Sequence, residues 1–151
     1  MNSRNFKTIM LLATCVLLLG SVAKAQDLHL KAQVPFDFKV GEMTMPTGTY
    51  ELTRIHDNTN RAFRIRGENA GMLKVMAPAY NKRTPEKNLL IFNKYQGTGG
   101  EVSYFLTKIR LAGEETGYDI GTTRAEQAAA ARAARRDIIT LVVERVKGAA
   151  E

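Results

Sequence analysis

The amino-acid sequence predicts a mainly β protein: a small antiparallel sandwich or barrel-like domain with one C-terminal α-helix. Three observations support this fold class. Apolar and polar residues alternate over several short stretches between residues 28 and 111, which is typical of strands with one buried face. Clusters of glycine, proline and asparagine separate these stretches, as turns do. An alanine-rich run with high helix propensity follows Gly121.

Residues 28–55 predict the first hairpin. Strict alternation at the start of this range is interrupted by Pro35, which has no N–H to donate and therefore belongs at an edge or a kink. Phe36 and Phe38 resume the alternation, and both are predicted to be core residues. A proline-threonine-glycine turn then leads to an antiparallel return strand over 50–55.

Four more strands are predicted between residues 62 and 111. The two with the strongest pattern flank a glycine-rich connection at 96–100, which suits the positive φ angles of a tight turn. Phe92, in the first of these two strands, is predicted to be a core residue. The four predicted strands are 62–66, 72–77, 89–95 and 102–111, with a surface loop over 80–88.

A helix is predicted over about 123–136. Thr123 and Glu126 form a capping box, in which the Thr123 hydroxyl accepts the backbone N–H of Glu126 and the Glu126 carboxylate reaches back to Thr123. Residues 138–146 are rich in β-branched side chains, which favours a final strand. A second helical segment with one apolar face is the alternative, because periodicity alone does not separate the two.

The first 25 residues predict a secretory signal peptide. A positively charged start precedes an apolar run over 9–22, and small residues occupy the two positions that a signal peptidase reads, the second being Ala25. An uncleaved anchor is the alternative, but the apolar run is shorter than the roughly 20 residues that span a membrane. Cleavage between Ala25 and Gln26 would leave a single domain, residues 26–151, outside the cytoplasm.

Composition limits the function of this mature domain. Losing the three cations of the leader lowers the net charge at pH 7 from +7 to +4, which does not demand a polyanionic partner such as nucleic acid. The single cysteine, Cys15, lies in the leader, so the domain would have no disulfide, thiol nucleophile or cysteine-ligated metal. We expect no cofactor and no transmembrane segment in the mature chain.

The motifs that carry enzyme chemistry or bind metal ions are weak in this sequence. His29 and His56 lack the spacing of metal ligands. Residues 57–60 lack the glycine and the distal glutamate of a calcium loop, and the glycines at 97–100 lack the lysine of a phosphate-binding loop. Glu114 and Glu115 are neighbours in a turn and do not converge on one bond from different environments. The sequence therefore predicts no catalytic residue and no metal ligand.

Arginines provide two candidate anion contacts. Around the strand at 61–66, a solvated strand face with one buried phenylalanine, Phe63, is the favoured interpretation. The predicted helix would present Arg124, Arg132 and Arg136 along one exposed stripe, because residues four apart on a helix lie together. This stripe is the candidate contact with phospholipid headgroups or an anionic polymer.

Several motifs occur in an order that resembles a group of short exported acidobacterial proteins. These motifs are VPFDFKVG at 34–41, MPTGTY at 45–50, LIFNKY at 90–95, YFL at 104–106 and TRAE at 123–126. The chain departs from the group in a longer connection at 96–101, and at 119–121 where the group more often has Leu-Pro. The resemblance implies a shared fold and export, and it implies no activity.

Together these patterns predict an exported, non-catalytic binding or structural protein of the bacterial cell envelope. Its partner would be an envelope polymer or an anionic surface. Two alternatives stay open: a hydrolase that acts on an envelope polymer or a small ester, and a β-barrel carrier whose phenylalanines line a cavity for an apolar ligand.

Overall fold

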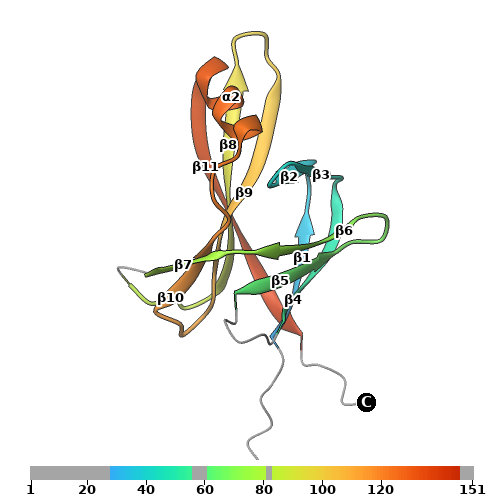
Figure 1. Cartoon of the computed structure of the whole chain (residues 1–151), viewed down its shortest axis with the longest axis vertical. Helices are drawn as coiled ribbons and strands as arrows, with labels where there is room; N and C mark the ends of the chain where they lie inside the picture. Colours follow the sequence, from blue (N-terminus) through green and yellow to red (C-terminus); the bar gives the residue numbers. More distant parts are fainter. Residues whose placement is uncertain (1–27, 56–60, 81–82, 147–151) are drawn as a thin grey trace, which may run out of the picture.

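A computed structural model of the chain describes residues 28–55, 61–80 and 83–146 (Figure 1). The predicted signal peptide and its cleavage site between Ala25 and Gln26 lie outside the described residues. So do His56 and the turn at 57–60.

The described residues form eleven strands and one helix, in agreement with the predicted fold class. In chain order the elements are β1 (His29–Val34), β2 (Phe38–Val40), β3 (Met43–Met45), β4 (Gly48–Ile55), β5 (Ala62–Arg66), β6 (Gly71–Val75), β7 (Ala77–Tyr80), β8 (Asn88–Gly97), β9 (Val102–Arg110), β10 (Thr116–Asp119), α2 (Arg124–Arg132) and β11 (Ala133–Val146). Among these residues, no helix has the length and apolar character to cross a membrane.

Nine strands follow one another along a single hydrogen-bonded sheet that is nearly closed. Their order is β3-β2-β9-β8-β11-β1-β4-β5-β6. Only one residue, Met76, separates β6 from β7, and β10 pairs with both β7 and β9. The sheet therefore curls back towards its own start, which confirms the barrel-like architecture. The pairing of β2 with β9 is parallel, so the sheet is mixed and not wholly antiparallel as predicted.

Phenylalanines fill the interior of this sheet. Phe38 and Phe92 are 3% and 0% exposed, which confirms both as core residues, and their rings meet edge to face at 5.4 Å. Phe36 is only half-buried and stacks on Tyr104 at 3.9 Å. Phe36 thus packs against the core but, contrary to the prediction for a core residue, is not fully buried in it. The reason is that β1 ends at Val34, before Pro35, and Phe36 lies in the bend before β2.

The C-terminal helix is shorter than predicted. It ends at Arg132, and residues 133–136 already belong to β11, which pairs with β8. In β11 the backbone N–H and C=O groups of these residues pair with β8, whereas at the end of an exposed helix they would bond to water. Tertiary contacts therefore override the helix propensity of these residues. Residues 138–146 also lie in β11, so the helical alternative for this segment is wrong.

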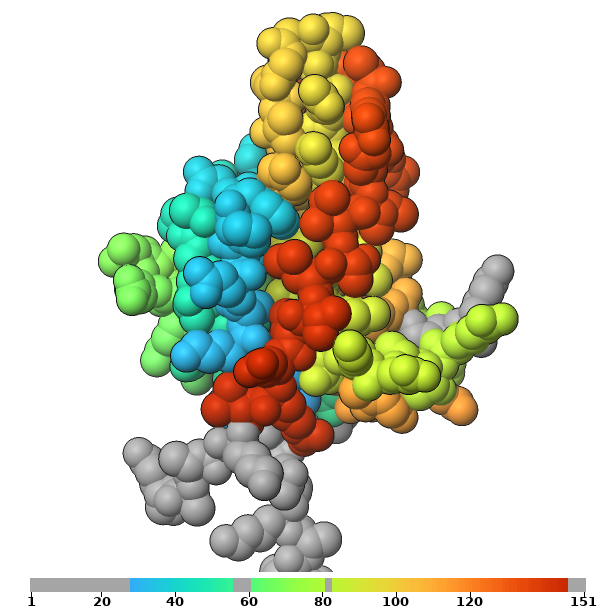
Figure 2. Space-filling model, turned by 180° about the vertical axis from the view of Figure 1, so that it is seen from behind, coloured from blue at the N-terminus to red at the C-terminus, as the bar shows by residue number. Residues whose placement is uncertain are grey.

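Strand β11 joins two parts of the molecule. Its first eleven residues, 133–143, pair with β8 except for Ala134, where the register shifts, and its last three pair with β1. The far ends of β8, β9 and β11 project beyond the rest of the sheet, with α2 packed against β8 and β11 there (Figure 1). From behind, β11 runs across the surface between β1 and β8 (Figure 2). This arrangement creates two places where polar side chains gather: the junction of α2 with β8, and the outer face of β1, β4 and β5.

Candidate functional site

A buried carboxylate fastens α2 to the sheet. Glu126 is only 3% exposed and Asn93 on β8 is 8% exposed. One carboxylate oxygen of Glu126 accepts hydrogen bonds from the Asn93 amide nitrogen at 2.7 Å and from the Tyr95 hydroxyl at 3.1 Å. Arg136 on β11 donates to the Asn93 amide oxygen at 3.2 Å. Every buried polar group here has a partner, as a desolvated carboxylate requires.

The capping box is only half formed. The Thr123 hydroxyl accepts the backbone N–H of Glu126 at 3.2 Å, as predicted. The Glu126 carboxylate points into the sheet, where Asn93 and Tyr95 offer two donors in a dry environment, and makes no hydrogen bond back to Thr123. Because hydrogen bonds to ionised groups are strong, this carboxylate holds the helix on the hairpin.

The predicted arginine stripe is not formed. Arg124 and Arg132 lie exposed on α2, but Arg136 lies on β11 because the helix ends at Arg132. The Arg136 guanidinium bonds to Asn93 and lies 5.7 Å from the centre of the Tyr95 ring. Arg124 and Arg132 are eight positions apart, more than two helical turns, so α2 presents two separated cations and no continuous anion-binding stripe.

Burial raises the pKa of three tyrosines in the folded protein. Burial raises the pKa of Tyr95, and the nearby Glu126 carboxylate raises it further. Burial also raises the pKa of Tyr118, and burial with the charge of Asp37 raises the pKa of Tyr50. In each case the folded protein retains the phenolic proton at a pH where the unfolded chain has lost it.

Alkaline pH is therefore expected to destabilise the protein. The folded pKa values lie above the usual value of 10.0, so the free energy of unfolding should fall as the pH rises above about 10. Urea unfolding at pH 8, 10 and 11 measures this dependence. Replacing Tyr118 with phenylalanine should make the fall shallower, since one of the shifted groups is gone. If the free energy of unfolding fell equally in the variant and the parent chain, Tyr118 would not contribute to the pH dependence.

The second gathering of polar side chains is the outer face of β1, β4 and β5. Strand register places Lys31 of β1 beside Glu51 of β4, and Glu51 beside Arg66 of β5. The end of β11 adds Glu144 beside Lys31. We call this the polar face; its members, all in or near this register, are His29, Lys31, Gln33, Thr49, Glu51, Thr53, Arg64, Arg66, Glu68 and Glu144.

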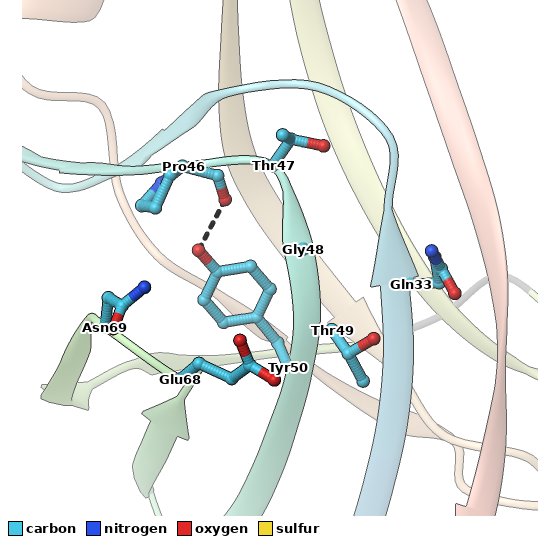
Figure 3. A pocket seen from close by; sticks show the side chains of 8 residues that line it. All are labelled: Gln33, Pro46, Thr47, Gly48, Thr49, Tyr50, Glu68 and Asn69. Atoms are coloured by element: carbon cyan, nitrogen blue, oxygen red, sulfur yellow. Dashed lines mark hydrogen bonds between the residues drawn. The ribbon is translucent and has the colours of Figure 1, made fainter.

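Two adjoining hollows lie on the polar face. The first has a volume of about 250 Å³ and is drawn in Figure 3, where Gln33, Thr49 and Glu68 border it. The second has a volume of about 380 Å³ and is bordered by Lys31 and Arg66 among others. Thr49 and Glu68 line both hollows, so the two adjoin, and the second is lined by residues of three strands, β1, β4 and β5.

The wall of the first hollow is held rigidly by Tyr50. Its hydroxyl donates to the Pro46 carbonyl (Figure 3), and its ring meets Phe38 edge to face at 5.1 Å. A side chain at Gly67 would lie 2.6 Å from the ring, so this position needs glycine for the close approach. Tyr50 therefore forms part of the wall of the hollow, although its side chain is almost completely buried.

Contacts at the same end of β1 join two of the sequence motifs. The Asp37 carboxylate accepts the backbone N–H of Thr47 at 2.7 Å, and the Thr47 hydroxyl donates to the Val34 carbonyl at 3.0 Å. The VPFDF and PTGTY segments therefore interlock, which gives both motifs a structural reason. Sequence reasoning recognised the motifs but not this contact.

The other candidates have structural roles. Both carboxylate oxygens of Glu114 accept from the same guanidinium nitrogen of Arg54, Nη2, at 2.9 Å. The Arg54 guanidinium also lies over the rings of Phe63 and Tyr118. His29 lies 3.4 Å from the Thr53 hydroxyl. In the part of the chain that the structure describes, no three histidine, cysteine or acidic side chains are grouped to hold a metal ion.

No family model, curated protein or solved structure matches this chain. Its function is therefore inferred from the geometry of the described residues. Of the two polar gatherings, the α2 junction is internally satisfied, whereas the polar face presents most of its side chains to solvent, His29 and Thr53 being partly buried. A ligand would find free hydrogen-bonding groups on the polar face.

Proposed function

We propose that this chain is an exported, non-catalytic binding protein of the cell envelope, and that its polar face holds a polar polymer. The observation that carries the proposal is the pair of adjoining hollows that share Thr49 and Glu68. Their volumes, about 250 and 380 Å³, are near the lower end of the range for ligand pockets. The sequence supports the export step through cleavage after Ala25.

The chemistry of the hollows favours a ligand rich in hydroxyl and amide groups. Gln33 and Asn69 contribute amides, Thr49 a hydroxyl and Glu68 a carboxylate. These groups give up hydrogen bonds to water when a ligand covers them, and only a polar ligand replaces those bonds. An open depression that crosses three strands also suits an extended chain more than a compact molecule.

The carrier alternative has less support. An apolar ligand needs a lined cavity, whereas Phe63 and Phe92 are both completely buried against other core side chains. Phe92 meets both Phe36 and Phe38 edge to face. These rings fill the space that a ligand would occupy, so the phenylalanines act as core and not as the lining of a pocket.

A hydrolase is the second candidate, because two carboxylates, Glu51 and Glu68, line the second hollow. Paired carboxylates are the machinery of glycoside hydrolysis. A general acid, however, works from a desolvated site, and both side chains are exposed. Replacing both residues with glutamine tests this candidate: turnover of a glycan that the double variant loses would favour the hydrolase.

The binding proposal predicts that side chains of the first hollow contribute to retention on purified cell-wall polymer. We expect the double variant Gln33→Ala, Glu68→Ala to bind about tenfold more weakly than the parent chain, since two hydrogen bonds of ordinary strength are lost. Co-sedimentation with insoluble polymer measures the affinity. The matched control is Arg124→Ala, Arg132→Ala, which alters exposed side chains on α2.

Two results would contradict this prediction. A loss of binding in the α2 control, with the hollow variant unaffected, would place the contact on the arginines. Absence of binding by the parent chain would overturn the proposed function.

A further inference from the structure

Charge on the polar face alternates from strand to strand. In one register row, Glu144 of β11, Lys31 of β1, Glu51 of β4 and Arg66 of β5 follow one another as direct neighbours. Neighbouring strands lie about 4.8 Å apart. The row is therefore a negative-positive-negative-positive series that runs across the strands.

The charges of the polar face also balance. Glu51, Glu68 and Glu144 supply three negative charges, and Lys31, Arg64 and Arg66 supply three positive charges. This face is neutral on a domain whose net charge at pH 7 is +4 once the three cations of the leader are removed. A neutral surface gives no long-range attraction to a polyanion. The positive net charge of the whole chain therefore does not predict which ligand this face binds.

In the described part of the chain, no ion pair joins these charges to one another, although opposite charges at facing strand positions attract. Among the described residues, the ion pairs join Arg54 to Glu114, Asp119 to both Lys108 and Arg110, and Arg135 to Asp137. None of these pairs includes a residue of the polar face. The register row thus holds carboxylates and cationic groups side by side, each exposed and free to meet a ligand.

A bound polymer must therefore meet both signs of charge. A neutral polymer laid over the row would displace water from four charged groups and offer only neutral partners in return, which is costly. A polyanion would match Lys31 and Arg66 but would oppose Glu51 and Glu144, and like charges brought together cost several kcal/mol in an interface. A polymer with amines and carboxylates in alternation matches all four.

We propose that the polymer held by the polar face is zwitterionic: a glycan that carries peptide substituents with free amines and free carboxylates. This inference rests on the proposed function and specifies the ligand of the same site. Amines of the polymer meet Glu51 and Glu144, and carboxylates of the polymer meet Lys31 and Arg66. The hydroxyl and amide groups of the glycan occupy the adjoining hollows.

The test uses the chain from Gln26 to Glu151 and four insoluble polymers. These are purified peptidoglycan, the same material with its amines acetylated, the same material with its carboxylates amidated, and an uncharged glucan. Co-sedimentation at low salt should give the tightest binding to untreated peptidoglycan, with affinity about tenfold weaker for each of the other three. Raising the salt concentration to 0.5 M should remove most of this preference, because exposed charges are then screened within a few ångströms.

Two variants connect the preference to named residues. Glu51→Gln, Glu144→Gln removes the groups that meet amines, so it should weaken binding to untreated polymer but not to acetylated polymer. Lys31→Gln, Arg66→Gln removes the groups that meet carboxylates, so it should spare binding to amidated polymer. Equal effects of each variant on every polymer would overturn the inference.

The outcomes separate this inference from the proposed function. Equal binding to all four polymers would overturn the zwitterionic ligand and leave the proposed function standing. Tighter binding to the acetylated or to the amidated form would show recognition of one charge sign only, which also overturns the inference. Binding to none of the four would overturn both.

Discussion

Replacing Phe92 with alanine is expected to lower the free energy of unfolding by about 3–5 kcal/mol. Phe92 is 0% exposed and lies on β8, the strand between β9 and β11. Its ring meets Phe36 at 5.3 Å and Phe38 at 5.4 Å, both edge to face. The variant loses the buried area of the ring and leaves a cavity in the core. Urea unfolding followed by circular dichroism measures the loss.

Tyr80 provides the matched control for this experiment. It is an aromatic residue of similar size on β7, and it is 84% exposed. Tyr80→Ala should change the free energy of unfolding by less than about 0.5 kcal/mol, the range of surface substitutions. A loss of that small size for Phe92→Ala would mean that the faces of β8 are assigned the wrong way round.

Removing the carboxylate of Glu126 is expected to have the second-largest effect. Glu126→Ala removes the acceptor that the Asn93 amide and the Tyr95 hydroxyl share in a buried site. The Asn93 amide nitrogen still has the Tyr95 hydroxyl oxygen at 3.4 Å, so the Tyr95 hydroxyl is the group left without an acceptor. One such orphaned group costs about 1–3 kcal/mol, and we expect a loss of that size. Hydrogen exchange should also become faster along α2, since this contact holds the helix against β8. Urea unfolding and amide exchange are the two measurements.

Gln127→Ala controls for helix propensity, because Gln127 lies on the same helix and is exposed. It should change stability by less than about 0.5 kcal/mol. Glu126→Gln retains one oxygen acceptor, so its loss of stability should lie between those of Glu126→Ala and Gln127→Ala. If Glu126→Ala were as mild as Gln127→Ala, the carboxylate would not be what fastens α2.

Local sequence pattern predicted much of this fold. Alternation located β1 and β5, and largely apolar runs located β8 and β9. The pattern of apolar and polar neighbours also identified Phe38 and Phe92 as core residues. The glycine-rich connection between β8 and β9 forms the expected turn, in which Gly100 has a φ of 87°. These features depend on residues close together in the chain, where period and turn chemistry suffice.

Features that depend on distant contacts could not be predicted. Residues 133–136 continue a helical composition, yet they form β11 because β8 offers a free edge about forty residues earlier in the sequence. Strand β10 has only four residues and contains Gly117, so it carries no alternation to detect. The parallel pairing of β2 with β9 likewise cannot be recognised from the sequence of either strand, because it joins segments more than sixty residues apart.

The predicted arginine stripe depended on a distant contact as well. Sequence reasoning chose Arg124, Arg132 and Arg136 because helical spacing brings them together, and the early end of α2 separates them. The polar face is assembled from four strands and the turn after β5, so its members come from widely separated segments. Alternation marked residues such as Lys31 as exposed, but only strand register decides which charges become neighbours.

Mapping the contact surface by NMR tests the binding proposal most directly. The labelled chain from Gln26 onwards is titrated with soluble peptide-bearing glycan fragments, and the shift of each backbone amide is recorded. We expect the largest shifts at Lys31, Thr49, Glu51 and Arg66, with little change along α2. Shifts centred on Arg124 and Arg132, or no shifts at millimolar fragment, would contradict binding at the polar face.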